Sequence, residues 1–358
     1  MAGRTSLEME LIWKAGHQPG RSFEPELFAL LEAIKNTGKL TTATTQVGVP
    51  YRQAWGLITV WSERMGQPLV IKEKGRGTQL TPLGERLLWA RQRITARLTP
   101  YLESAASELE QELNQILEEP SAALTMFASH DLVLAELREF LRARPGPKLD
   151  VRFVGSLESV IALYRGRCDL AGFHVPEGAR GREILRQYKP WFKPRAQRVI
   201  HFVRRSQGFL VAPGNPLGIM TLADVAQKGA RFINRQPGSG THLALERMLQ
   251  EQGIDRADIK GYYTEEFTHL AVAAAVASGV ADVGVGIEAA ARKLDLDFIP
   301  LFVEDYYLLG KRETVEREDV EAIVTSLKSS DFAALVRHIP GYDMSRTGEI
   351  TSVSDLMG

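Results

Sequence analysis

Four joints in the second half of the chain place a hydroxyl side chain where a helix is expected to begin. The first amide groups of a helix have no partner within the helix, and the helix dipole favours negative charge near them. One such joint is ordinary helix capping, but four in one domain predict a pocket for a small anion. Arg235 and His269 lie beside these joints and would add a charge or a hydrogen bond. The other expected ligand-binding residues are Ser129, Ser156, Ser239, Gly240, Thr241 and Thr268.

Short apolar runs precede these joints and predict the sheet that positions them. Segments such as ALTMFAS, KLDVRFVG and ADVGVGI alternate with helical segments such as THLALERMLQEQG. Strand–helix alternation is typical of a parallel sheet with helices on both sides, which binds ligands at the carboxyl ends of its strands. The second half of the chain is therefore expected to be an α/β domain.

A different pattern, rich in helices, occupies the first part of the chain. An amphipathic helix over 23–38 precedes a short helix over 41–47, a glycine-containing turn and a longer helix over 50–65. This order predicts a helix-turn-helix, in which the start of the second helix reads the major groove of DNA. The competing interpretation is a small helical domain in which Trp55 and Trp61 are merely core residues. The expected DNA-binding residues of these helices are Thr42, Tyr51, Arg52, Gln53 and Trp55.

A basic hairpin completes this first module. Two strands are expected over 69–73 and 78–81, joined by a glycine-rich tip that contains Lys74 and Arg76. Between residues 50 and 97, nine basic side chains stand against three acidic ones, whereas the whole chain has 44 of each. The hairpin therefore predicts a wing that lies along the backbone of double-stranded DNA.

A long helix is expected between residues 83 and 117, and Pro100 should bend it or begin a second helix. Its apolar residues recur every three, four or seven positions, which is typical of a helix that packs against a partner helix. A homodimer, or a tetramer of two dimers, is therefore expected, and the alternative is packing on its own domain. The residues of this apolar stripe are Leu87, Ile94, Leu98, Leu102, Ala105, Leu109, Leu113 and Ile116.

Specific motifs in both halves resemble known families. LLEAIKNTGKLTTATTQVGVPYRQAW is similar to the winged-helix domain of ModE-type molybdate-responsive regulators, and PLVIKEKGRGTQLTPLGERLL resembles the wing of ModE and LysR-type regulators. NRQPGSGTHLALER and THLAVAAAVASGVADVGVGIEAAA resemble the periplasmic-binding-protein-like domain that occurs fused to ModE-type winged helices. The resemblance implies an N-terminal winged helix-turn-helix, a linker helix and a two-lobed periplasmic-binding-protein-like domain of type 2.

The domain boundaries that we expect follow from this resemblance. The DNA-binding domain would span 1–83, the linker and dimerisation helix 84–120, and the effector domain 121–358. Lobe one of the effector domain would comprise 121–208 and 304–358, and lobe two 209–303. Tyr306, in the segment that returns to lobe one, is an expected residue of the cleft between the lobes.

The resemblance also implies an effector. Related transport proteins hold molybdate or tungstate with neutral donors, and the hydroxyl residues at the four joints would hold such an oxyanion, or a metabolite linked to the molybdenum cofactor. The alternatives are a small carboxylate such as formate, or sulfate, which Arg235 would favour. A further alternative is a DNA-binding scaffold that senses no ligand.

Other classes of protein are not supported by the sequence. Ser129, His130 and Asp131 have the residue types of a catalytic triad, but consecutive residues cannot align as nucleophile, base and orienting acid. The histidines are scattered and there is one cysteine, so no metal, cofactor or catalytic residue is expected, and the protein is expected not to be an enzyme. The first residues contain no continuous apolar segment and no membrane span is expected. The sequence therefore predicts a cytoplasmic, ligand-responsive transcriptional regulator.

Overall fold

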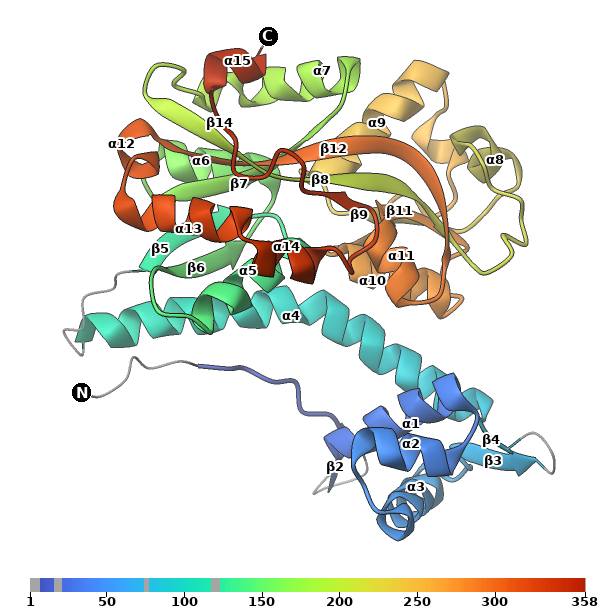
Figure 1. Ribbon diagram of the computed structural model, residues 1–358. Coiled ribbons are helices and arrows are strands. Elements are labelled where there is room, and N and C mark those ends of the chain that lie inside the picture. The colour runs from blue at the N-terminus through green and yellow to red at the C-terminus, as the bar shows by residue number, and fades with distance from the viewer. Residues whose placement is uncertain (1–6, 16–20, 74–76, 117–122, 358) are drawn as a thin grey trace. The chain divides into compact units, whose positions relative to one another are not determined.

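The computed structural model describes residues 7–15, 21–73, 77–116 and 123–357 (Figure 1). The chain divides into two compact units. The N-terminal unit is Glu10–Thr95, and the C-terminal unit is Ala96–Gly358 together with Met1–Met9. Lys74 and Arg76, the expected wing-tip residues, lie outside the described residues.

The N-terminal unit contains three helices and a hairpin. The helices are α1 (Pro25–Thr37), α2 (Leu40–Val47) and α3 (Tyr51–Met65), and the hairpin pairs β3 (Val70–Glu73) with β4 (Gly77–Leu80). A further short pair joins β1 (Lys14–Ala15) to β2 (Arg21–Ser22). Helix α2 ends at Gly48, whose φ of 73° is a left-handed conformation that favours glycine. These elements form a winged helix-turn-helix, as the sequence predicts.

The two tryptophans of α3 have different environments. Trp61 is buried, its ring stacks on Phe23 at a centroid distance of 3.9 Å, and its Nε1 donates to Glu24 Oε2 at 2.6 Å. Trp55 is 36% exposed. The interpretation of both as core residues is therefore right for Trp61 and wrong for Trp55, because Trp55 lies on the face of α3 that points away from the core.

The hairpin is held against the helices by a close backbone contact. Thr78 N donates to Gly38 O at 2.9 Å, and a Cβ added at Gly77 would lie 2.2 Å from the same oxygen. Only glycine fits at Gly77, which also has a positive φ of 85°. The base of the wing is thus fixed to the end of α1.

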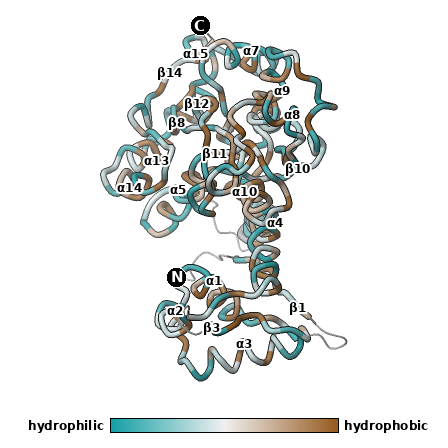
Figure 2. The backbone as a smooth tube through the Cα atoms, turned by 90° about the vertical axis from the view of Figure 1, so that its right-hand side faces the viewer, coloured by the Kyte–Doolittle hydropathy of each residue, from teal (hydrophilic) through white to brown (hydrophobic). Residues whose placement is uncertain are grey.

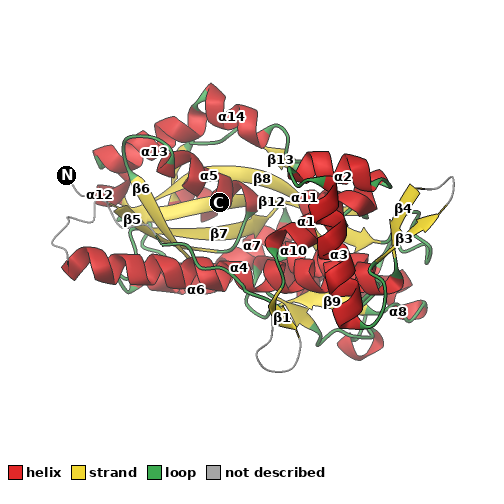
Figure 3. Cartoon of the chain, turned by 90° about the horizontal axis from the view of Figure 1, so that it is seen from below, coloured by secondary structure: helices red, strands yellow, loops and turns green. Residues whose placement is uncertain are grey.

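A ten-stranded sheet organises the described part of the C-terminal unit. Its main path is β10-β9-β11-β8-β12-β7-β5-β6, and β13 and β14 pair with β8. Figure 3 shows β8, β12, β7, β5 and β6 side by side, with helices around them. The strands are β5 (Ala123–Ala128), β6 (Lys148–Phe153), β7 (Leu170–Pro176), β8 (Gln197–Val211), β9 (Phe232–Arg235), β10 (Glu265–Glu266), β11 (Val283–Ile287), β12 (Asp297–Lys311), β13 (Tyr342–Asp343) and β14 (Ile350–Ser352).

The sheet is divided into two lobes by its longest strands. β8 and β12 have 15 residues each and run antiparallel through both halves. β5 pairs with β6 and β7 in parallel in lobe one, and β9 pairs with β10 and β11 in parallel in lobe two. This arrangement confirms the predicted two-lobed α/β fold of the periplasmic-binding-protein type.

Helices cover both faces of each lobe. In Figure 2 the chain alternates between teal and brown along outer helices such as α5 and α13, as expected of helices with one buried face. Lobe one has α5 (Leu132–Arg142), α6 (Ser156–Tyr164), α7 (Ala179–Tyr188), α12 (Arg312–Val315), α13 (Glu318–Lys328), α14 (Ser330–Val336) and α15 (Val353–Met357). Lobe two has α8 (Leu222–Gln227), α9 (Gly240–Gln252), α10 (His269–Ala277) and α11 (Glu288–Lys293). Short 3-10 turns lie at Lys189–Trp191 and Arg256–Asp258.

One helix, α4 (Pro82–Ile116), belongs to both units. It continues through Pro100, so the alternative of a second helix beginning there is wrong. None of the eight residues of the predicted apolar stripe is buried, and Ile116 is 76% exposed. In a single copy of the chain the stripe is therefore only partly covered: Leu87 packs against the core of the N-terminal unit, whereas Ala105, Leu109 and Ile116 are exposed.

Candidate functional site

The start of α3 presents an exposed polar face. Tyr51, Arg52 and Gln53 are exposed and follow the turn after α2, whose Thr42 is exposed as well. Arg52 and Gln53 make no hydrogen bond or ion pair with any residue that the structure describes. Their donors are therefore available to a partner, in the position where a helix-turn-helix contacts base edges.

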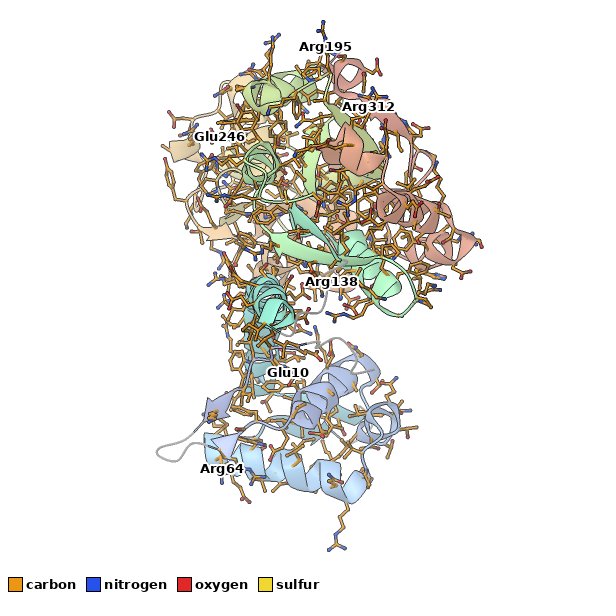
Figure 4. The ribbon with its side chains drawn as sticks, turned by 90° about the vertical axis from the view of Figure 1, so that its left-hand side faces the viewer. Glu10, Arg64, Arg138, Arg195, Glu246 and Arg312 are labelled. Carbon is orange, nitrogen blue, oxygen red and sulfur yellow. The ribbon has the colours of Figure 1, made fainter. Side chains whose placement is uncertain are left out.

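Lys72 of the wing joins this face and is absent from the predicted set. Its Nζ donates to Tyr51 Oη at 3.1 Å and lies 4.3 Å from the centroid of the Trp55 ring. These contacts hold a cation and two aromatic rings together on one surface. The only signal in the sequence is that Lys72 precedes the basic wing tip, which does not reveal its contact with α3. Arg64, nearer the end of α3, is also exposed (Figure 4).

The four predicted helix starts are formed by α5, α6, α9 and α10. Ser239 caps α9 by accepting from His242 N at 3.2 Å, and Thr268 caps α10 by accepting from Ala271 N at 3.0 Å. At α5 the cap is instead Asp131, whose carboxylate accepts from the amides of the first turn. Ser156 is the first residue of α6 and not its cap. Two hydroxyls are thus used for capping, and two remain for other contacts.

The free hydroxyls of lobe one meet directly. Ser129 Oγ lies 3.0 Å from Ser156 Oγ, which lies 3.3 Å from Nδ1 of the buried His174. Tyr306 Oη donates to Ser129 O at 3.0 Å, and its ring stacks on His174 at 3.9 Å. The structure therefore brings together three of the predicted residues, Ser129, Ser156 and Tyr306, with a histidine that the sequence did not indicate.

The start of α9 brings lobe two against this group. A Cβ built on Gly240 would lie 3.2 Å from His174 Cβ, 3.9 Å from Glu304 Oε2 and 4.0 Å from Ser156 Oγ. Thr241 Oγ1 accepts from Gln207 Nε2 at 3.0 Å. We call the buried group formed by Ser156, His174, Gln207, Gly240, Thr241, His269 and Glu304 the interlobe site.

Arg205, a buried arginine on β8, is the main cation beside the interlobe site. It donates to Glu304 Oε1 at 2.7 Å and to Asp131 Oδ2 at 2.5 Å, and its Nη2 lies 3.3 Å from His269 Nε2. Tyr342 Oη also donates to Asp131 Oδ2, at 2.7 Å. Burial alone would lower the pKa of Arg205, but the Glu304 and Asp131 carboxylates more than offset this and raise it.

Arg235 is a second buried arginine, and its setting is different. Its guanidinium donates to Gln236 Oε1 at 3.1 Å and to Phe267 O at 2.9 Å, and no described carboxylate pairs with it. Burial, and then the charge of Arg205, lower the pKa of Arg235 to about 9. Burial, and then the charges of Arg205 and Arg235, hold the pKa values of His174 and His269 well below the usual range, so both rings are neutral at pH 7.

Several atoms of the interlobe site have no hydrogen-bond partner among the residues that the structure describes. The atoms are His174 Nε2, Gln207 Oε1, His269 Nδ1 and Glu304 Oε2, all on buried residues. Buried polar groups in proteins nearly always have a partner, which is water, a ligand or another group of the chain. A cluster of such atoms between two lobes, next to the starts of helices, is therefore a candidate binding site.

The segment that precedes α10 contacts α4 within the C-terminal unit. Arg97 on α4 forms two hydrogen bonds with Glu266, at 2.7 and 2.6 Å, and Tyr101 packs on Phe267 at 4.8 Å between ring centroids. Thr268 Oγ1 donates to Ala96 O at 2.9 Å. That carbonyl lacks its usual donor, because the residue four positions later is Pro100, which has no N–H. Thr268 was predicted to bind ligand, but its hydroxyl is occupied by α4 and by the cap.

Lobe one contacts α4 as well. Arg138 on α5 pairs with Glu103 on α4 at 3.1 Å (Figure 4). Arg142, one turn further along α5, lies 3.7 Å from Glu110. The second half of α4 is therefore attached to both lobes of the C-terminal unit.

The described residues contain no cluster of three or more His, Cys, Asp or Glu side chains with the arrangement of a metal site, and none of their helices combines the length and the apolar character of a membrane span. Ser129 and Asp131, on either side of His130, contact different partners, Ser156 and Arg205.

The chain contains a winged helix-turn-helix followed in sequence by a two-lobed α/β domain, and comparisons with known proteins agree with this organisation. The PBP superfamily domain matches residues 137–328, so the chain belongs to this superfamily. It is 33% identical over 224 residues to the uncharacterized protein YvgK of Bacillus subtilis (strain 168), covering 62% of this chain and 70% of YvgK. It is 30% identical over 101 residues to the molybdenum transport protein ModE of Azotobacter vinelandii, covering 27% of this chain and 36% of ModE. The expected relationship to ModE-type proteins and to periplasmic-binding-protein-like domains is confirmed.

A solved structure of low sequence identity also matches most of this chain. A hydrogen peroxide-bound mutant of OxyR from Corynebacterium glutamicum has 15% sequence identity and a TM-score of 0.44, and the match covers 87% of this chain and 94% of that one.

Proposed function

We propose that this protein is a DNA-binding transcriptional regulator that responds to a small anionic effector. The observation that supports this most directly is the presence, in one chain, of an exposed cationic face at the start of α3 and a buried, unsatisfied polar site between two lobes. The first has the chemistry of a DNA-reading surface and the second that of a ligand site. The similarity to ModE adds support.

The DNA-binding residues in this proposal are those of the α2–α3 face and the wing. Arg52 and Gln53 would read base edges, and Tyr51, Trp55 and Lys72 would contact the phosphate backbone or flanking bases. Thr42, Lys74 and Arg76 complete the set. We assign DNA binding to residues 1–83, linking and dimerisation to 84–120, and effector binding to 121–358.

The proposed assembly is a homodimer, or a tetramer of two dimers, formed through α4. The exposed part of its apolar stripe, Ala105, Leu109 and Ile116, supports it, because exposed apolar side chains with this repeat are stabilised when a second helix covers them. A two-fold dimer would also place two recognition helices on symmetric half-sites.

The effector would bind at the interlobe site. Ser129, Ser156, Gly240 and Thr241 supply hydroxyls and helix starts, and Tyr306 closes the lobe-one side. Ser239 and Thr268 would act through the caps that they form, and His269 and Arg235 would supply nearby donors or charge. Molybdate and tungstate are the first candidates, because a similar protein is named for molybdenum transport. A small carboxylate such as formate, or sulfate, is the second candidate, which the two buried arginines favour.

Regulation would follow from a difference in affinity between two arrangements of the lobes. A ligand that bridges the lobes favours the closed arrangement, and the contacts of Glu266, Phe267 and Thr268 with α4 would transmit this change to the linker helix. The carbonyl of Phe267 also accepts from Arg235, so one short segment connects the site to α4.

The test uses full-length protein, a fluorescent duplex DNA library, and oxyanions and carboxylates added one at a time. Arg52→Ala combined with Lys72→Ala should weaken DNA binding more than tenfold in an anisotropy titration, because two phosphate or base contacts are lost. Arg195→Ala, an exposed arginine of the C-terminal unit, is the matched control and should leave DNA binding unchanged.

An effector should raise the unfolding temperature and change the affinity for selected DNA. Ser239→Ala combined with Thr241→Ala should abolish this stabilisation. Unchanged DNA binding by the Arg52 and Lys72 variant would reject the DNA-binding assignment. Normal DNA binding with no response to any compound would leave a DNA-binding scaffold as the function.

A further inference from the structure

Two oxygens of the interlobe site are acceptors without a donor. Glu304 is fully buried, and its Oε1 accepts from Arg205 and from Gln207 Nε2, each at 2.7 Å, whereas its Oε2 has no partner. Gln207 is equally buried, and its Oε1 also has no partner. A carboxylate oxygen and an amide oxygen cannot donate. Any partner of these two oxygens must therefore bring hydrogen-bond donors to them.

These acceptors lie beside a feature that attracts anions. Glu304 Oε2 is 3.9 Å from the position of a Cβ on Gly240, the first residue of the 13-residue helix α9. Ser156, the first residue of α6, lies next to the same glycine. Two helix starts favour negative charge, whereas the carboxylate next to them opposes it. The site is thus suited to a group that has anionic oxygens on one side and a donor on the other.

The buried charges near the site support the same conclusion. Arg205 is paired with both Asp131 and Glu304, so one cation faces two carboxylates, and Arg235 is the second cation. These four groups carry no net charge. Molybdate, tungstate and sulfate have no proton at neutral pH, and each would present only acceptors to Glu304 Oε2. Repulsion of this kind is how a binding site rejects a close analogue of its ligand.

We propose that Glu304 is a specificity-determining residue that accepts a hydrogen bond from the effector, and that the effector is an anion with its own O–H or N–H donor. The chemistry is an anionic oxygen adjacent to a donor. It is found in a protonated oxyanion such as hydrogen phosphate and in a small hydroxy- or amino-carboxylate. This inference rests on the proposed ligand-binding function and replaces its first candidates, molybdate and tungstate, by anions that carry a donor.

The experiment compares matched pairs of compounds that differ in the donor. Full-length protein is titrated by calorimetry with inorganic phosphate against sulfate and molybdate, and with glycolate against acetate. We expect the donor-bearing member of one pair to bind at least tenfold more tightly, because a buried acceptor left unpaired costs at least that much affinity. A preference for phosphate indicates a protonated oxyanion as the effector, and a preference for glycolate indicates a small carboxylate with its own donor.

Glu304→Gln tests the residue itself. The amide can keep its oxygen at the Oε1 position, facing Arg205 and Gln207, and then places an NH2 donor where Oε2 was. We expect the preference to reverse, with donor-bearing ligands at least tenfold weaker and sulfate or molybdate tighter. Glu136→Gln, an exposed glutamate on α5, is the matched control and should leave both affinities unchanged.

The outcomes separate this inference from the proposed function. Tight binding of molybdate or sulfate to the wild-type protein, with weaker binding of phosphate and glycolate, would overturn the role of Glu304 and leave the regulator intact. A folded Glu304→Gln variant with an unchanged preference would do the same. If no compound of either kind binds, both proposals fail. If the Glu304→Gln variant does not fold, the matched pairs of compounds titrated into the wild-type protein still test the role of Glu304.

Discussion

The α3 face and the interlobe site use the same residue type in opposite ways. Arg52 on α3 is exposed and has no described partner, whereas Arg205 is 3% exposed and contacts Glu304, Asp131 and His269. A solvated arginine contributes little to the free energy of folding, so its favourable interactions are gained when a partner such as DNA binds. A buried arginine must be paired within the fold, so its interactions already hold neighbouring groups in position.

Arg235 occupies an intermediate position between these two cases. It is as buried as Arg205 but is bonded only to Gln236 and to a backbone carbonyl. Burial and the charge of Arg205 lower its pKa to about 9, so it remains charged at pH 7 without a carboxylate partner. A buried charge of this kind can accept an anion without first breaking an ion pair.

The largest expected effect is on the free energy of unfolding and tests the buried arginine. Arg205→Met leaves Asp131 and Glu304 as unpaired buried carboxylates, and we expect the free energy of unfolding to fall by about 3–5 kcal/mol. Arg52→Ala should change it by less than about 0.5 kcal/mol, because the side chain is solvated. Urea denaturation of both variants measures the difference. Similar losses of unfolding free energy in the two variants would contradict the distinction between a buried, paired arginine and a solvated one.

The next effect concerns pH and involves only the C-terminal unit. Burial lowers the pKa of His130 to about 4 in the fold, against an ordinary value of 6.5. Below pH 6.5 the unfolded chain takes up this proton before the folded chain does, so the free energy of unfolding should fall between pH 6.5 and 4, by up to about 3 kcal/mol. The loss should be smaller in His130→Gln and unchanged in His338→Asn, which alters an exposed histidine. An equal loss in both variants would assign the effect to other groups.

The third effect is on the salt dependence of DNA binding and tests the exposed residues of α3 and the wing. The logarithm of the DNA affinity falls linearly with the logarithm of salt concentration, and each phosphate contact adds about 0.9 to the slope. Lys72→Ala should reduce the slope by about 1 for each subunit that binds, whereas Gln53→Ala should leave the slope unchanged and relax base preference. Anisotropy titrations at several salt concentrations measure both. A slope unaffected by the loss of Lys72 would exclude this lysine from the phosphate contacts.

The smallest effect is on the coupling between effector binding and DNA binding. Thr268→Val keeps the shape of the side chain but removes the hydroxyl that donates to Ala96 O, and Glu266→Gln weakens the pairing with Arg97. We expect effector affinity to stay within about twofold in Glu266→Gln and to fall further in Thr268→Val, which also loses the α10 cap, while the change in DNA affinity caused by the effector falls by about two- to tenfold in both. Glu265→Gln, at the neighbouring position, is the control. Full coupling in the Thr268 and Glu266 variants would show that these contacts do not transmit the signal.

Part of both regions could be predicted from the sequence. Helix boundaries, the hairpin and the position of Arg52 follow from local patterns, because apolar periodicity and glycine turns act over a few residues. The association of Ser129 with Ser156 was anticipated only as a common edge of the sheet. Lys72 was missed, since its contact with Trp55 joins two elements that are separate in the sequence.

The polar residues of the interlobe site were harder to foresee. Arg205 and Gln207 on β8, and Glu304 and Tyr306 on β12, are spaced two apart, so each pair shares one face of its strand. Charged residues at this spacing inside apolar strands are a usable signal, because burying a charge is costly unless a partner is present. Which partner each residue has depends on the pairing of β8 with β12 and on the contact between the lobes.

By itself, the sequence determined the order of the elements, the winged helix-turn-helix, the α/β class of the second domain and its hydroxyl-bearing helix starts, since these depend on neighbouring residues, and its resemblance to known domains implied the two lobes. The tertiary structure alone decided that Arg205 is neutralised by Asp131 and Glu304, that Thr268 bonds to α4, and that Glu304 Oε2 and Gln207 Oε1 remain without donors. Such facts depend on atoms far apart in the chain, brought within a few ångströms in a medium of low dielectric constant, where each missing or additional partner changes the energy substantially.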